Sequence, residues 1–112
     1  MVVCALEVRL YLPGACSLKD KRRVLRSLVD QVRHRFNVSV AETDDQDLHQ
    51  SIVIGLACVS GSGEHARRSL DTVVRRIEDH CEAEVVSVTD VMPEPGFWPE
   101  NRQPGPGRAD PG

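Results

Sequence analysis

The residues whose types and spacing most clearly indicate a binding role are basic, and they are concentrated in one segment. Residues 17–36 hold seven Lys and Arg side chains against two aspartates. Arginine presents a planar fork of donors that matches phosphate oxygens, and each phosphate that a cation neutralises releases counterions. The segment therefore predicts a surface for an RNA backbone, and the residues that we expect to contact it are Lys19, Lys21, Arg22, Arg23, Arg26 and Arg33.

Charge alone leaves an alternative open for this segment. The net charge of the whole chain is −3, which argues against a general affinity for nucleic acid. Runs of charge on a helix are also the ordinary solvated surface of a small protein. The basic segment is therefore either an RNA-binding face or a solvated helix face.

A second charged segment has the opposite sign. Residues 42–50 carry four carboxylates and neither Lys nor Arg. They lack the glycine and the closing glutamate of a calcium-binding loop, and a single histidine is too little for a zinc site. We therefore expect no metal and no cofactor, and we interpret residues 44–50 as a polar loop. Its carboxylates could instead pair with the basic helix of a neighbouring subunit.

The sequence does not indicate a nucleophilic catalytic site. His34, His65 and His80 lie far apart along the chain, and no Ser–His–Asp or Cys–His arrangement can be argued from them. Cys16 precedes a predicted helix, where a thiol pKa can be lowered, but we interpret it as a helix-entry residue. We expect a protein that is not an enzyme and has no small-molecule substrate. The remaining alternative is an enzyme using a set from the acidic segment: Asp44, Asp47 and His49.

The elements that position the basic residues follow from hydrophobic periodicity. Alternation in residues 2–12 predicts a strand with one apolar face. An amphipathic pattern predicts a helix from Leu18 to Phe36, with Ser17 as its N-cap and Asp20 as a capping partner. Lys21 falls on the apolar side of this helix, and we interpret it as extending past the edge of the sheet.

The rest of the pattern completes a fold. Residues 36–43, 51–60 and 83–92 read as strands, and Ser62 opens a second helix whose apolar stripe runs from Ala66 to Cys81. The order βαββαβ predicts a ferredoxin-like α+β sandwich over residues 1–92, with two helices on one face of a four-stranded antiparallel sheet. Residues 93–112 are rich in proline and glycine, and we predict a disordered tail there.

The other face of the predicted sheet is expected to be small and apolar. Of its residues in the first and third strands, only Tyr11 could stack on a base, so recognition of the RNA-recognition-motif type is not expected. Such a face predicts an interface with a partner protein or with a second copy, unless it is an open face without a partner. The interface would consist of Val3, Ala5, Tyr11, Val53, Ala57 and Val59.

The cellular setting is also indicated by the sequence. The four cysteines form no CxxC pair, which favours reduced thiols over a disulfide framework. Residues 1–12 lack the pattern of a signal peptide, and no apolar run approaches a membrane span. We therefore expect a cytoplasmic protein with no membrane association.

Four stretches of this sequence are similar to one protein family. They are VVCALEVRLYLPG, SLKDKRRVLRSL, RFNVSVAETDDQDL and IVIGLACVS. They resemble the YlxP-like family of bacterial proteins, domain of unknown function 503, over residues 2–92. The resemblance implies a ferredoxin-like fold. It also implies a role around ribosomal RNA or the small ribosomal subunit, because genes of this family lie beside those for translation initiation and ribosome maturation. His49 departs from the family, which often has tryptophan there, and the tail is additional.

Overall fold

The computed structural model describes residues 1–80 and 82–92. Cys81 and the predicted tail from Pro93 onward lie outside the described residues. The elements follow the predicted order: β1 (Val2–Tyr11), α1 (Leu18–Arg35), β2 (Ser39–Asp44), β3 (Ser51–Ser60), α2 (Gly63–Glu78) and β4 (Glu84–Met92).

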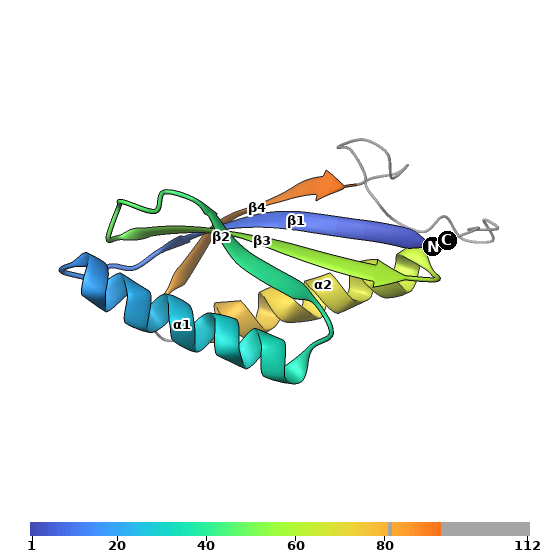
Figure 1. Cartoon of the computed structure of the whole chain (residues 1–112), viewed down its shortest axis with the longest axis horizontal. Coiled ribbons are helices and arrows are strands. Elements are labelled where there is room, and N and C mark those ends of the chain that lie inside the picture. The colour runs from blue at the N-terminus through green and yellow to red at the C-terminus, as the bar shows by residue number, and fades with distance from the viewer. Residues whose placement is uncertain (81, 93–112) are drawn as a thin grey trace.

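The four strands form one sheet in the order β2-β3-β1-β4, and each neighbouring pair is antiparallel. Both helices pack on the same face of this sheet, and no other described helix or strand covers the opposite face, which we call the open face (Figure 1). The predicted ferredoxin-like α+β architecture is therefore confirmed. The layering places the basic helix and the open sheet face on opposite sides of the molecule.

The core is aliphatic and lies between the sheet and the helices. Inward residues of the two central strands face one another in register, as Leu6 does with Leu56 and Val8 with Ile54. All four are at most 1 % exposed. From the helix side, α2 contributes a stripe with spacings of three and four residues, the period that brings side chains onto one helix face. Its members are Ala66, Leu70, Val73 and Ile77.

Side chains fix both helix starts, as the sequence predicted. The Ser17 hydroxyl accepts a hydrogen bond from the Asp20 backbone N–H at 3.2 Å, and the Asp20 carboxylate accepts one from the Cys16 N–H at 2.9 Å. The Ser62 hydroxyl accepts from the His65 N–H at 3.3 Å. These contacts satisfy N–H groups that a helix start leaves without intrahelical partners. They also set where α1, with its cations, begins.

Candidate nucleic-acid interface

Four cations of α1 lie along one flank of the helix. Lys19, Arg22, Arg26 and Arg33 are all exposed. At 3.6 residues per turn they fall within about 60° of arc and extend over about 21 Å of helix. The guanidinium of Arg33 donates to the Val40 carbonyl of β2 at 3.1 Å, which shows that this flank faces the edge strand β2. We call these four residues the basic stripe.

Three members of the basic stripe have no anionic partner within residues 1–80 and 82–92. No carboxylate in that part of the chain forms an ion pair with Lys19, Arg22 or Arg26. A phosphate group could therefore approach these cations without first displacing a protein carboxylate. Exposed charges remain hydrated, so contacts at such a surface weaken with added salt.

Arg23 belongs to the predicted set but is already engaged. Its guanidinium binds the Glu82 carboxylate through two N–O contacts, of 2.9 and 3.4 Å. The hydrogen bond from Arg23 lowers the pKa of Glu82, and the same bond raises the pKa of Arg23. Glu82 lies between α2 and β4, so this pair connects α1 to the segment that leads into β4. A ligand would have to compete with Glu82 for Arg23.

The structure corrects the prediction for Lys21. Its side chain is 2 % exposed and lies inside the protein, where it cannot contact RNA. Its ammonium is 2.8 Å from the Glu42 carboxylate and donates hydrogen bonds to the carbonyls of Asp45 and Leu48. A buried ammonium needs such partners because losing its hydration costs several kcal/mol. Sequence periodicity placed Lys21 correctly on the inner side but could not show the carbonyls that hold it.

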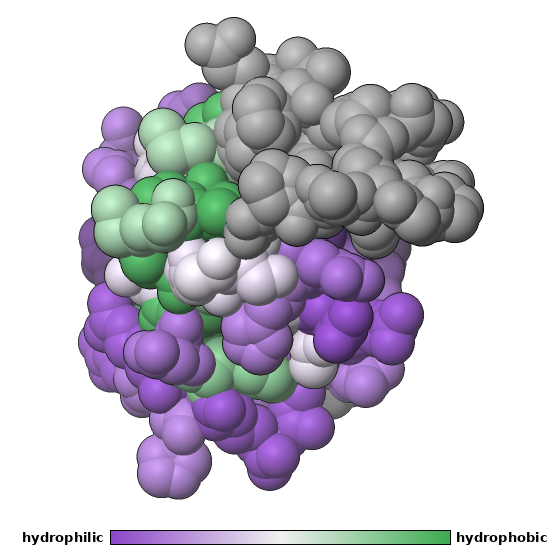
Figure 2. Space-filling model, turned by 90° about the vertical axis from the view of Figure 1, so that its right-hand side faces the viewer, coloured by the Kyte–Doolittle hydropathy of each residue, from purple (hydrophilic) through white to green (hydrophobic). Residues whose placement is uncertain are grey.

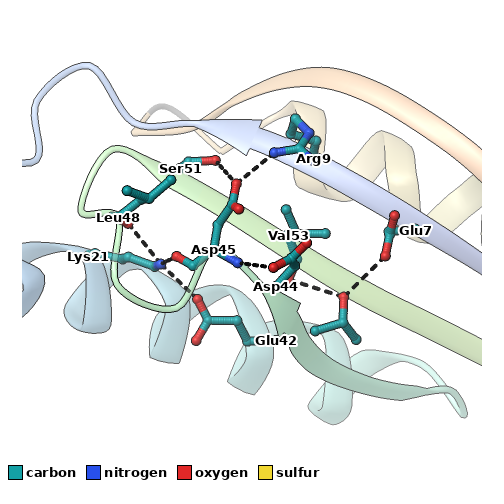
Figure 3. A network of polar contacts seen from close by, with 10 residues as sticks. Glu7, Arg9, Lys21, Glu42, Asp44, Asp45, Leu48, Ser51 and Val53 are labelled. Atoms are coloured by element: carbon teal, nitrogen blue, oxygen red, sulfur yellow. Dashed lines mark hydrogen bonds and ion pairs between the residues drawn. The ribbon is translucent and has the colours of Figure 1, made fainter.

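The acidic segment is organised by two basic residues from other elements (Figure 3). Lys21 holds the backbone of the β2–β3 connection from the side of α1. Arg9 of β1 forms a 2.6 Å ion pair with Asp45, whose carboxylate also accepts a 2.7 Å hydrogen bond from Ser51. The Ser51 hydroxyl contributes most to lowering the pKa of Asp45, and Arg9 adds to it. Asp45 adopts a positive φ of 56°, a conformation that Asp tolerates through local hydrogen bonding.

The acidic segment therefore lies beside the first turn of α1 in the same chain. Asp44 and Asp47 are exposed, and they neighbour Asp45 and Leu48, whose carbonyls accept the hydrogen bonds from Lys21. Residues 1–80 and 82–92 contain no group of three or more His, Cys, Asp or Glu side chains that could hold a metal ion. The set Asp44, Asp47 and His49 is not drawn together into such a group. The carboxylates instead place negative charge at one end of the basic stripe.

The open face of the sheet has an apolar end and a polar end. Val3 pairs with Val59, and Ala5 pairs with Ala57 on one side and Met92 on the other. Val59 is 59 % exposed and Met92 is 50 % exposed. Figure 2 views the molecule from this end and shows hydrophobic residues gathered at its upper left, above a lower half that is mostly hydrophilic. Of the predicted interface, these contacts bring together Val3, Ala5, Ala57 and Val59.

Two residues of the predicted interface do not join this patch. Val53 is only 1 % exposed, so it cannot form part of a surface, and that prediction is wrong. Its cross-strand neighbours are Arg9 and Asp44, so it lies next to the ion pair of Arg9 with Asp45. Tyr11 is exposed but lies opposite Ser51, at the polar end. Val91 and Met92 of the edge strand β4 are exposed beside the apolar end. We call this surface the apolar patch, and its residues are Val3, Ala5, Ala57, Val59, Val91 and Met92.

A shallow hollow adjoins the apolar end. It has a volume of about 330 Å³, and small residues such as Ala5, Ala41 and Ala57 line it. Gly55 also lines it, and a Cβ there would lie 3.0 Å from the Thr43 methyl group. The hollow thus exists because four neighbouring positions carry at most one side-chain carbon.

The described cysteines are free thiols. Cys4 and Cys58 face one another across β1 and β3 and are buried, whereas Cys16 is exposed. Burial raises the pKa of both Cys4 and Cys58. A nucleophilic cysteine needs the opposite shift, so these two thiols are core residues.

The fold and the basic stripe define a small ferredoxin-like α+β protein with an exposed cationic helix. The chain belongs to the family described as "Protein of unknown function (DUF503)", whose model matches residues 3–90. It is 39 % identical over 78 residues to "Uncharacterized protein YlxP" of Bacillus subtilis (strain 168), a match that covers 70 % of this chain and 85 % of that protein. The family expected from the sequence is thus confirmed. None of the described helices has the length and apolar character to span a membrane.

Proposed function

We propose that this protein is a non-enzymatic RNA- or ribosome-associated factor that docks through the basic stripe of α1. The observation that carries the proposal is the line of three exposed cations, Lys19, Arg22 and Arg26, that no described carboxylate pairs with. Arg33 extends the line, with one hydrogen bond to the protein. Cations at such spacing can each contact a phosphate, which is how most protein contacts to a nucleic-acid backbone are made.

The position of α1 supports docking as a rigid unit. The helix is capped at Ser17, held at its start by buried Lys21 and tied in its second turn by Arg23 to Glu82. Cations presented on a fixed helix lose less conformational freedom on binding than cations on a loop. The acidic segment at the N-terminal end repels phosphates, which gives the stripe a defined boundary and a direction toward Arg33.

The test is co-sedimentation of the purified protein with small ribosomal subunits at low and moderate salt. The variant Arg22→Glu/Arg26→Glu should lose binding, because it reverses the centre of the stripe and breaks none of the described contacts. The control is Arg68→Glu/Arg75→Glu, which makes the same net charge change on exposed positions of α2 and breaks only the exposed ion pair of Arg68 with Glu64, a kind of pair that contributes little to stability. Equal loss in both variants would show that net charge alone matters. Binding of the α1 variant at the wild-type level would overturn the proposal.

A second candidate function is supported by the open face. Exposed Val59, Val91 and Met92 beside an apolar hollow are the kind of patch that marks a protein–protein contact. On this proposal the apolar end of the sheet pairs with a second copy of the chain. Ala57→Glu would place a charge at the centre of the patch and should reduce the molar mass measured by analytical ultracentrifugation to that of a monomer. A wild-type protein that is monomeric at high concentration would exclude self-pairing.

A further inference from the structure

A pocket with a cationic rim lies at the C-terminal end of α1. Its volume is about 320 Å³, at the lower end of the range for small-ligand sites. The walls come from the end of α1 and the residues after it, from the end of β3 and from residues 65–72 of α2. Arg35 and His65 lie among the lining residues, and none of those residues is acidic.

The lining combines apolar surface with open hydrogen-bonding groups. Phe36 contributes an aromatic ring, while Asn37 and Ser69 contribute an amide and a hydroxyl. Within residues 1–80 and 82–92 neither of these two polar side chains has a hydrogen-bond partner. A flat polar ring with donors and acceptors at its edge suits such walls, because protein sites for single-stranded bases combine stacking with hydrogen bonds to base edges.

The last turn of α1 connects the pocket to the basic stripe. Arg33, His34 and Arg35 are consecutive, basic and exposed. At 100° per residue they extend about 200° around the helix, from the flank that faces β2 to the flank that faces α2. Arg33 is the end of the basic stripe, and Arg35 is on the rim of the pocket. The last turn therefore places basic side chains on the helix surface between the basic stripe and the pocket.

We propose that this pocket holds one nucleotide of a single-stranded RNA whose backbone lies along the basic stripe, with the base beside Phe36, Asn37 and Ser69 and its phosphate at Arg35. This inference rests on the proposed RNA-binding function and narrows it to an unpaired strand. The pocket would supply the contact with a base. The open face of the sheet is not expected to do so, because Tyr11 is the only residue of its first and third strands that could stack on a base.

The test measures binding of a short fluorescent single-stranded RNA of mixed sequence over a range of salt. Ser69→Leu fills the pocket without changing charge and should weaken binding about tenfold, the effect of losing one stacked base, while the slope of affinity against salt stays the same. Arg35→Gln should instead lower that slope by about 0.7, the effect of one phosphate contact on a single strand. Ser87→Leu on β4 is the matched control and should bind like the wild type.

The experiment distinguishes failure of the proposed function from failure of the pocket assignment. If the wild type does not bind the RNA at all, the proposed function falls, and the nucleotide pocket with it. If the wild type binds with the expected salt slope but Ser69→Leu and Asn37→Ala both bind equally well, only the pocket assignment is overturned. Uridine monophosphate should bind far more weakly than the strand, because it cannot reach the stripe. Equal affinity for the mononucleotide would overturn the link to a strand and identify a small-molecule site.

Discussion

At the residue scale, Lys21 is a basic residue whose role is structural, because its side chain is buried. It lies in the basic segment, yet its ammonium is enclosed by the Glu42 carboxylate and two backbone carbonyls. It thus contributes nothing to the positive surface. Its role is to join the start of α1 to the β2–β3 connection, which sets the distance between the basic stripe and the acidic segment.

Removing the ammonium should destabilise the fold. Lys21→Met leaves the Glu42 carboxylate and two carbonyls without their cation, and breaking a buried pair from one side costs about 3 kcal/mol. Urea unfolding would measure this, with the exposed Lys19→Met as the control expected to stay within about 0.5 kcal/mol of the wild type. The double variant Lys21→Met/Glu42→Gln should lose less than the two single variants added together. A Lys21→Met protein as stable as the wild type would show that the pair is dispensable.

Asp45 makes stability depend on acid pH. Its folded-state pKa is lowered, first by the Ser51 hydroxyl and then by Arg9, so its stabilising contribution is fully present above the unfolded-state pKa. That contribution is lost as the pH falls through the folded-state value. Asp45→Asn tolerates the positive φ and should therefore be less stable than the wild type near pH 6, with a smaller difference near pH 3. Urea midpoints at the two pH values measure this, and an unchanged difference would contradict it.

At the element scale, α1 combines a structural and a surface role on separate faces. Its inner face carries Val24, Leu28 and Val32, which are at most 3 % exposed, and its outer flank carries the basic stripe. The helix is fixed at both ends, by Ser17 at its start and by the Arg33 contact with β2 near its end. Charge reversal on the outer flank should therefore alter binding without unfolding the domain.

The cap of α1 offers a direct test of this separation. Ser17→Ala removes the acceptor of the Asp20 N–H and should lower the free energy of unfolding by about 1 kcal/mol. RNA affinity at a temperature where the variant is still folded should remain close to that of the wild type, because no stripe residue is changed. Thermal unfolding and the RNA titration measure the two effects. Ser27→Ala in the middle of α1 is the control, and a cap variant of wild-type stability would contradict the assigned role of Ser17.

At the scale of the whole molecule, the two candidate surfaces lie on opposite sides of the sheet. The basic stripe belongs to the helix layer, and the apolar patch belongs to the open face (Figure 1). Their physical character also differs. Contacts of cations with phosphates weaken steeply with salt, whereas apolar contacts change little.

Independence of the two surfaces is therefore expected. Ala57→Glu should leave RNA affinity and its salt slope unchanged, and Arg22→Glu/Arg26→Glu should leave the molar mass in solution unchanged. Raising salt should release RNA without altering the molar mass. RNA titrations and sedimentation of both variants at two salt concentrations measure this. Loss of RNA binding on Ala57→Glu would show that the two surfaces form a single interface.

The sequence by itself determined the family, the order of the elements and the layers of the fold. Apolar residues recur at every second position in the strands, as in Leu6, Val8 and Leu10, and at every third or fourth position in the helices. These repeats are local properties of the chain, so the sequence alone reveals them. The capping roles of Ser17 and Ser62 are local for the same reason. The exposed cations Lys19, Arg22 and Arg26 followed from the same periodicity, because the outer side of an amphipathic helix is solvated.

Only the tertiary structure decided what depends on residues distant in sequence. Lys21 is buried because carbonyls 24 and 27 positions away come within reach of its ammonium. Val53 is buried where its neighbours on β1 and β2 are Arg9 and Asp44, whereas Ala57 on the same strand has the small neighbours Ala5 and Ser39 and is not buried. Met92 joins the patch because β4 pairs with β1. The pocket beside Arg35 combines three elements that are separated along the chain. Periodicity assigns a side chain to a face, but burial and partners are properties of the packed molecule.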